Sequence, residues 1–167
     1  MDEWESAAHG LAGQVAALAM ERGITLATAE SCTAGLVSHL LGRTPGVSTV
    51  FLGGIVAYAN EAKRNLLDVP AELLDRHGAV SEAVALAMAR GARTRLSADL
   101  AVSTTGIAGP GGGSPEKPVG LVYIAVVSGQ SEQCIRFQFA GDRQENIHAS
   151  ATSALTLLRA ALMGINA

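Results

Sequence analysis

The sequence contains few of the residues that mark several large classes of protein. Cys32 and Cys134 are the only cysteines among its 167 residues, and they stand too far apart to form a disulfide framework or the spacing of a zinc site. Aromatic residues make up 4% of the chain and the formal net charge is −3, which argues against the basic patches and stacking platforms that bind nucleic acids. We therefore expect no structural metal, no disulfide and no nucleic-acid partner.

Long apolar runs and a basic leader are also missing. Although 49% of the residues are hydrophobic, no run approaches the roughly 20 apolar residues of a membrane span. The first residues, MDEWES, are acidic, unlike the start of a secretory signal. We expect a cytoplasmic protein without a membrane segment, because unpaired cysteines are typical of a reducing compartment. The length and the apolar content predict a single domain over residues 1–167.

Lysine is the scarcest of the basic residues. Only Lys63 and Lys117 occur among twelve lysine and arginine residues. Because arginine stays protonated in proteins whereas a partly buried lysine can lose its proton, a lysine base can come from only these two positions. The histidines show no metal-ligand spacing, and we expect them at the surface or at helix ends: His9, His39, His77 and His148.

The rest of the chain alternates between helical and strand patterns. Apolar residues at helical spacing predict helices near residues 3–22, 31–42, 60–68, 71–76, 82–96 and from 142 onward. Apolar runs predict strands near residues 24–28, 50–58, 99–104, 119–127 and 132–139, with Gly53–Gly54 marking a bulge or a close backbone approach. This order predicts an α/β fold, a three-layer α/β/α sandwich on a mixed, mostly parallel sheet with one antiparallel hairpin.

The first candidate site lies where the first predicted strand gives way to a helix. Ser31 falls at or beside the expected helix start, where a hydroxyl can cap the helix, bind an anion or act as a nucleophile. Cys32 is a rival nucleophile, because helix N-termini lower the pKa of a thiol. Capping is the common role of a serine in this position, so the local sequence identifies a site without identifying its reaction.

Three polar residues, Ser31, Asn60 and Thr105, each follow a predicted strand. Ligands of such sheets bind at the carboxyl ends of the strands, so we expect these residues to lie near one another, although Asn60 also suits a helix cap. The glycine-rich stretch 105–120 lacks the Lys-Ser/Thr pair of a phosphate loop and leads into a strand, which also excludes a dinucleotide fingerprint. Its glycines leave backbone N–H groups free to approach a ligand.

Two cations, Lys63 and Arg143, are predicted in first helical turns, where the helix dipole disfavours positive charge. For Arg143 this position suggests an external anion such as a phosphate, and the alternative is a solvated arginine whose stem packs on the surface. For Lys63 the same partial charges, together with any desolvation, favour the neutral amine.

Six blocks of the sequence resemble the CinA C-terminal domain family and occur in the family's order. They are ATAESCTAG (27–35), GGIVAYANEAK (53–63), GAVSEAVA (78–85), TTGIAGPGGG (104–113), KPVGLVYIA (117–125) and FAGDR (139–143). Characterised enzymatic members of this family are nicotinamide mononucleotide (NMN) deamidases. The resemblance covers nearly the whole chain and implies hydrolysis of NMN to nicotinate mononucleotide and ammonia, without a metal or an organic cofactor.

The resemblance also implies roles for individual residues. Ser31 would be the nucleophile, Lys63 its base, and Tyr58 a neighbour that we count with the catalytic residues. Arg143 would face the phosphate of NMN. The remaining positions implied to contact the substrate are Glu30, Thr33, Gly35, Asn60, Thr105, Gly106 and Gly109.

Two functions from different classes remain open. The first is an NMN amidohydrolase of the Ser–Lys type, and the second is a catalytically weak nucleotide-binding or regulatory module of the same family. A third possibility keeps the amidase chemistry with another amide as the substrate. It is suggested by Ala34, where the family usually has Gly, and by Ala59, where the family often has Ser. We expect NMN as the small-molecule partner. We also expect a homodimer, since twofold assemblies are common.

Overall fold

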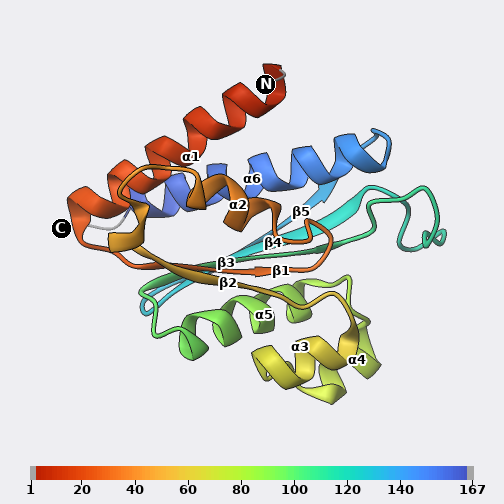
Figure 1. The fold of residues 1–167 in the computed structure, drawn as a ribbon. Helices are drawn as coiled ribbons and strands as arrows, with labels where there is room; N and C mark the ends of the chain where they lie inside the picture. Colours follow the sequence, from red (N-terminus) through yellow and green to blue (C-terminus); the bar gives the residue numbers. More distant parts are fainter. Residues whose placement is uncertain (1–2, 165–167) are drawn as a thin grey trace.

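The computed structural model describes residues 3–164, so residues 1–2 and 165–167 of the expected single domain lie outside the description. Figure 1 shows a central sheet with helices on both faces. One face carries α1 (Glu3–Arg22), α2 (Leu36–Gly42) and α6 (Arg143–Gly164), and the other carries α3 (Asn60–Leu67), α4 (Ala71–His77) and α5 (Glu82–Arg95). The predicted three-layer α/β/α class is therefore confirmed.

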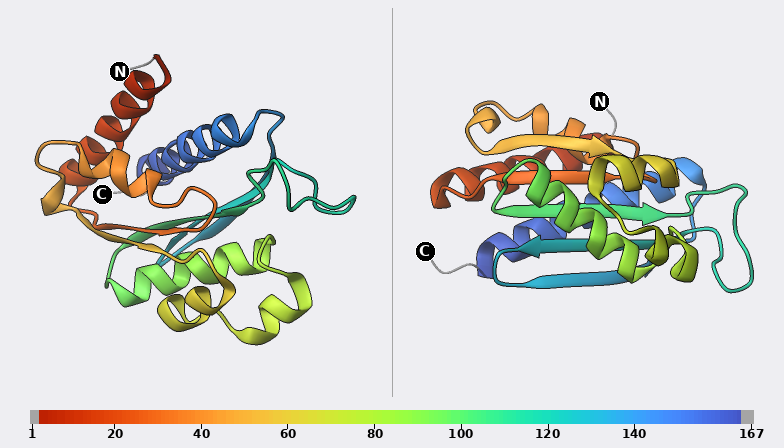
Figure 2. Two further views of the ribbon diagram at one scale, coloured as in Figure 1. Left: turned by 45° about the vertical axis from the view of Figure 1, so that its right-hand side comes forward. Right: turned by 90° about the horizontal axis from the view of Figure 1, so that it is seen from below.

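The sheet has the strand order β2-β1-β3-β4-β5. Its strands are β1 (Leu26–Glu30), β2 (Phe51–Val56), β3 (Leu100–Gly106), β4 (Leu121–Ser128) and β5 (Glu132–Gln138). β1 pairs in parallel with β2 and β3, whereas β4 runs antiparallel to both β3 and β5 (Figure 2). Four strands thus share one direction, and the carboxyl ends of β1, β2 and β3 meet at one edge of the sheet, as the mixed and mostly parallel prediction requires.

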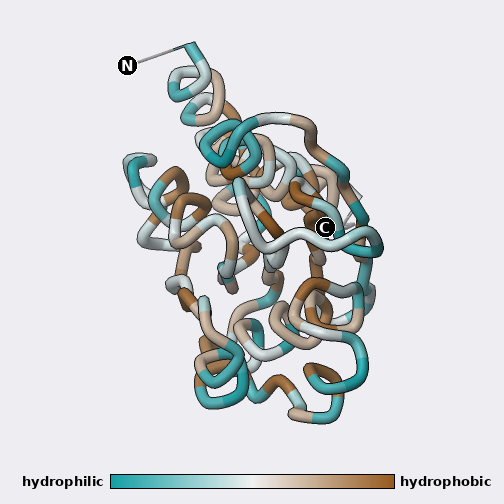
Figure 3. The backbone as a smooth tube through the Cα atoms, turned by 90° about the vertical axis from the view of Figure 1, so that its right-hand side faces the viewer, coloured by the Kyte–Doolittle hydropathy of each residue, from teal (hydrophilic) through white to brown (hydrophobic). Residues whose placement is uncertain are grey.

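Both helical layers are held by side chains buried against the sheet. The small residues Ala12, Ala16 and Ala19 let α1 approach its neighbours, and α5 supplies Val84 and Met88 to the core on the opposite face. β1 and β3 are buried nearly throughout because both of their faces are covered. Figure 3 shows the hydrophilic residues mainly on outer turns and loops. No helix between residues 3 and 164 is long and apolar enough to cross a membrane.

The helix starts agree with the sequence in two places and differ in two others. Ser81 caps α5 by accepting a hydrogen bond from the Val84 amide at 3.3 Å, at the start of the helix predicted near residues 82–96. At α6 the Asp142 and Glu145 side chains each accept a bond from the other's amide, at 2.9 and 2.8 Å. However, α2 begins only at Leu36, after a turn over residues 31–35, and α3 is preceded by Ala59. The predictions that Ser31 and Asn60 are helix caps are therefore wrong.

The glycine pair in β2, Gly53–Gly54, marks both a bulge and a close backbone approach, the two alternatives that the sequence suggested. Leu26 pairs with Phe51 and Ala27 pairs with Gly53, so the strand register shifts around Leu52. A Cβ atom on Gly54 would lie 2.1 Å from the Ser38 hydroxyl oxygen. The missing side chain therefore lets β2 lie directly beneath α2.

A second close approach yields a stability prediction. A Cβ atom on Gly91 of α5 would lie 2.0 Å from the carbonyl oxygen of Leu67, at the end of α3. Gly91→Ala would push the two helices apart, and we expect it to lower the free energy of unfolding by about 2 kcal/mol. Gly13→Ala is the matched control, because its Cβ would meet nothing within 4 Å, and it should raise stability by up to about 1 kcal/mol. Urea unfolding measures both, and a stabilising Gly91→Ala would contradict the packing described here.

Candidate functional site

Ser31 and Lys63, which are 32 positions apart in the sequence, meet in the fold. Ser31 follows β1, and Lys63 lies in the first turn of α3, just beyond β2. The Lys63 Nζ atom lies 3.0 Å from the Ser31 Oγ atom in hydrogen-bonding geometry. Both residues are buried, Lys63 with 1% of its surface exposed and Ser31 with 8%. Because β1 and β2 are parallel neighbours, their carboxyl ends deliver the hydroxyl and the amine to the same place.

The surroundings of Lys63 favour a neutral amine aimed at Ser31. Its Nζ atom also donates to the backbone carbonyls of Ala57 at 3.0 Å and Tyr58 at 2.9 Å. Burial lowers the pKa of Lys63, and no carboxylate among residues 3–164 forms an ion pair with it. A neutral amine can give its two protons to these carbonyls, which leaves its lone pair to accept the Ser31 hydroxyl proton. The geometry is thus suited to general-base chemistry.

Cys32 does not share this environment, although it is the next residue. Cys32 is 5% exposed, and burial raises the pKa of its thiol to about 12. Because α2 starts four residues later, Cys32 also lies outside the helix start that would have lowered the pKa of its thiol. The expectation of a thiol activated by the helix is therefore wrong.

Glu30 is buried against the start of α2, whereas the family resemblance implied that it contacts the substrate. It is 1% exposed, and its carboxylate accepts backbone N–H bonds from Gly35, Val37 and Ser38 at 2.8–3.0 Å. The hydroxyls of Thr33 and Ser38 donate to the same carboxylate at 2.7 and 2.6 Å. Glu30 therefore caps α2 from the end of β1 and fixes the turn that carries Ser31.

The same network accounts for Thr33 and Gly35. Thr33 is 2% exposed, and its hydroxyl is hydrogen-bonded to both Glu30 and Thr104. Gly35 has a φ of 98°, a conformation that favours glycine, and its amide binds Glu30. The side chain of Thr33 is therefore directed into the protein beneath the turn. The backbone amides of Cys32 and Thr33, in contrast, have no partner in any other residue of the described chain.

A second group of contacts joins Arg143 to the Ser31–Lys63 pair. The Arg143 guanidinium donates to the Gly109 carbonyl at 2.7 Å and to the Tyr58 hydroxyl at 3.1 Å. Tyr58 is 55% exposed, and its backbone carbonyl is one of the two that hold Lys63. The start of α6, the glycine loop (residues 107–120) and the ends of β1 and β3 lie together at the right-hand end of Figure 1. Ser31, Lys63, Tyr58, Gly109 and Arg143 thus form one connected cluster.

Three other predicted residues have more peripheral or structural positions. Asn60 is exposed at the first position of α3. The Thr105 hydroxyl donates to the Ala79 carbonyl at 2.8 Å, so this side chain faces the connection between α4 and α5. A Cβ atom on Gly106 would lie 2.5 Å from a methyl group of Val122, so glycine is required there for strand packing. The Thr105 side chain and the absence of a side chain at Gly106 thus serve the fold.

Asn146, which was not among the residues predicted for the site, connects α6 to the glycine loop. This residue is 1% exposed and donates to the Ala108 carbonyl at 3.0 Å and the Gly141 carbonyl at 2.9 Å. The only signal in the sequence was a polar residue next to the apolar stripe of the last helix.

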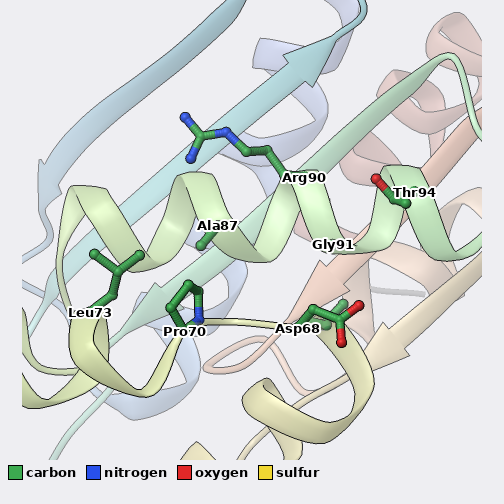
Figure 4. A pocket seen from close by; sticks show the side chains of 8 residues that line it. Asp68, Pro70, Leu73, Ala87, Arg90, Gly91 and Thr94 are labelled. Carbon is green, nitrogen blue, oxygen red and sulfur yellow. The ribbon is translucent and has the colours of Figure 1, made fainter.

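Other parts of the described structure offer less chemistry. Between residues 3 and 164, no group of three or more His, Cys, Asp or Glu side chains could hold a metal ion. A pocket of about 340 Å³ lies between α5 and the α3–α4 segment, lined by residues that include Asp68, Pro70, Leu73 and Arg90 (Figure 4). It contains none of the predicted site residues, and its Arg90 side chain is paired with Glu132.

Comparison with known sequences identifies relatives over nearly the whole chain. The model of the CinA C-terminal domain matches residues 8–162. A CinA-like protein of Thermosynechococcus vestitus is 53% identical over 156 residues, which are 92% of this chain and 38% of that protein. A CinA-like protein of Parasynechococcus marenigrum is 51% identical over 150 residues, 90% of this chain and 35% of that protein. The chain thus spans little more than a third of the length of these relatives.

Solved structures resemble the fold closely. The competence/damage inducible protein CihA of Agrobacterium tumefaciens is 42% identical with a TM-score of 0.90, covering 93% of this chain and 95% of that one. The competence damage-inducible protein A (ComA) of Klebsiella pneumoniae is 36% identical with a TM-score of 0.92, covering 95% and 99%. The resemblance seen in the six sequence blocks is confirmed, and the chain belongs to the CinA C-terminal domain family.

Proposed function

We propose that this chain is a Ser–Lys amidohydrolase that converts NMN to nicotinate mononucleotide and ammonia. The observation that carries the proposal is the buried Lys63 amine 3.0 Å from the Ser31 hydroxyl, with its other hydrogen bonds directed to two backbone carbonyls. An amide is a weak electrophile, so its hydrolysis needs a nucleophile, a base and donors for the oxyanion. The site offers a group for each of these roles.

In the proposed reaction, neutral Lys63 accepts the Ser31 proton while Oγ forms a bond to the carboxamide carbon of NMN. The negative charge on the amide oxygen is stabilised by the backbone N–H groups of Cys32 and Thr33, which have no partner elsewhere in the described chain. The N–H groups at the start of α2 are not used, because Glu30 already binds them. The first of these donors, Cys32, follows the nucleophile directly in sequence, as does one of the two oxyanion donors in hydrolases with a serine in a sharp turn.

The tetrahedral intermediate then collapses with breakage of the carbon–nitrogen bond. The Lys63 ammonium gives its proton to the departing nitrogen, ammonia leaves, and Ser31 carries the acyl group as an ester. A water molecule attacks this ester with Lys63 again accepting the proton. Nicotinate mononucleotide is released, and the proton returns to Ser31 Oγ.

Arg143 is the proposed phosphate ligand. Among the described residues its guanidinium makes two hydrogen bonds, both to neutral acceptors, the Gly109 carbonyl and the Tyr58 hydroxyl. A guanidinium has five N–H donors and binds phosphate more strongly than neutral oxygen. The Tyr58 hydroxyl orients the guanidinium, while the backbone of the same residue holds the base.

The test of the proposal is ammonia release from purified protein given NMN, nicotinamide riboside or nicotinamide. We expect turnover of NMN, with little from the two compounds that lack the phosphate. Binding of NMN without ammonia release would favour the alternative, a catalytically weak nucleotide-binding module. Equal turnover of NMN and the riboside would contradict the phosphate contact.

Arg143→Gln provides a specific prediction for the same site. We expect the KM for NMN to rise about 10- to 100-fold with kcat within about threefold, because a charge-assisted contact to phosphate is worth about 1.5–3 kcal/mol. Steady-state kinetics with NMN and with the riboside measures the effect. Arg159→Gln is the matched control, since Arg159 also lies on α6 but binds Gln14 at the other end of the helix. An unchanged KM in Arg143→Gln would contradict the assignment.

A further inference from the structure

Two side chains at the start of α6 hold consecutive carbonyl groups of the glycine loop. Asn146 Nδ2 donates to the Ala108 carbonyl at 3.0 Å, and the Arg143 guanidinium donates to the Gly109 carbonyl at 2.7 Å. Asn146 is buried, and the same amide group also binds the backbone of Gly141. The conformation of the loop next to Arg143 is therefore set from α6.

These contacts determine where the neighbouring N–H groups point. The C=O and N–H of a trans peptide point in opposite directions, so the Gly109 N–H is directed away from Asn146. The Ile107 carbonyl accepts the Gly120 amide at 2.7 Å, so the Ala108 N–H is directed away from Gly120. Neither N–H donates to a residue of the described chain, although Ala108 and Gly109 are both buried. Buried N–H groups nearly always have a hydrogen-bond partner. Because these two N–H groups have none within the described chain, they are available to an external acceptor.

We infer that Asn146 is a positioning residue for the phosphate of the substrate. By turning the Ala108 carbonyl toward α6, it presents the Gly109 N–H beside the Arg143 guanidinium. Backbone N–H groups next to an arginine form an anion-binding concavity. This inference rests on the proposed function, because it assumes that the anion belongs to a nucleotide such as NMN.

A purely structural role for Asn146 makes different predictions. Its contacts with Gly141 help to form the start of α6, but Asp142 and Glu145 already cap that helix. Loss of a general support would weaken every ligand and lower stability. Loss of a phosphate-positioning contact would weaken only ligands that carry the phosphate.

The experiment measures binding by calorimetry in the Ser31→Ala background, in which we expect no turnover. We expect Asn146→Ala to weaken NMN binding about tenfold and to leave nicotinamide riboside within twofold. In the protein with Ser31 intact, the KM for NMN should rise to a similar extent with kcat within threefold. Ser150→Ala is the matched control, because Ser150 is buried on α6 and its hydroxyl donates to the Asn146 backbone carbonyl rather than to the loop. It should change neither affinity.

The outcomes distinguish a failure of this inference alone from a failure of the proposed function. If the Ser31→Ala protein binds NMN and Asn146→Ala leaves that affinity unchanged, the inference is overturned while the proposed function stands. Equal weakening of NMN and the riboside also overturns it, because that result indicates a structural role. If the Ser31→Ala protein binds no NMN, the proposed function and the inference both fail. Asn146→Ser keeps a polar group but cannot reach Ala108, and its binding is measured in parallel. Thermal unfolding of both Asn146 variants shows whether either one is misfolded.

Discussion

Ser31→Ala should reduce ammonia release from NMN by at least about 10³-fold, whereas Cys32→Ala should retain most of the rate. The expected loss is of the size seen when a serine hydrolase loses its nucleophile, because the covalent step has no substitute. Cys32 is not expected to substitute, since burial raises the pKa of its thiol to about 12 and keeps it protonated. A coupled assay for ammonia measures both variants.

Two controls make this comparison decisive. Ser31→Ala should keep the unfolding midpoint and the NMN affinity of the unaltered protein, because Glu30 and Thr33 hold the turn without the Ser31 hydroxyl. Cys32→Ala removes a small buried group and should cost only about 1 kcal/mol of stability. Loss of activity in Cys32→Ala, with activity retained in Ser31→Ala, would show that the nucleophile has been assigned to the wrong residue.

Lys63→Met should be as damaging as the loss of the nucleophile. Methionine keeps an unbranched stem of similar length but provides no lone pair for the Ser31 proton. In the unaltered protein, kcat/KM should rise with pH as Lys63 loses its proton, with a midpoint below the ordinary lysine pKa of 10.5, because burial lowers the pKa of this group. The pH–rate profile measures this directly.

The role of charge can be separated from the role of the base with Lys63→Arg. Arginine stays protonated, so it retains the positive charge and should still be inactive. Lys117→Arg is the matched control, since Lys117 binds the His77 carbonyl outside the cluster. Substantial activity in Lys63→Arg would mean that position 63 contributes charge rather than proton transfer.

Much of the fold could be predicted because its signals are local. The Ser81 cap, the Asp142–Glu145 capping pair and the β4–β5 hairpin all depend on residues close in sequence. The rule that parallel strands bring their carboxyl ends to the same edge predicted only that Ser31, Asn60 and Thr105 lie near one another, and the pairing of Ser31 with Lys63 was implied by the family resemblance. Six blocks that resemble a known family, in that family's order, then suggested the reaction that such a pair could perform.

The start of α2 could not be predicted from the sequence, for a physical reason. Ser31 resembles a helix cap, but the N–H groups of α2 are bound by Glu30, whose carboxylate reaches them from the preceding strand. That contact depends on the shape of the turn. The direction of the Thr105 hydroxyl toward Ala79 and the reach of Asn146 to Ala108 are likewise tertiary contacts, which residue spacing does not reveal.

The proposed mechanism requires that the Lys63 amine is uncharged often enough to accept a proton from Ser31. Because the chain has only two lysines, selective ¹³Cε labelling of lysine gives two resonances, and Lys117→Arg identifies the one from Lys63. The NMR pH titration should show Lys63 losing its proton below the ordinary lysine value of 10.5. A Lys63 resonance that titrates at or above that value in the folded protein would contradict the account.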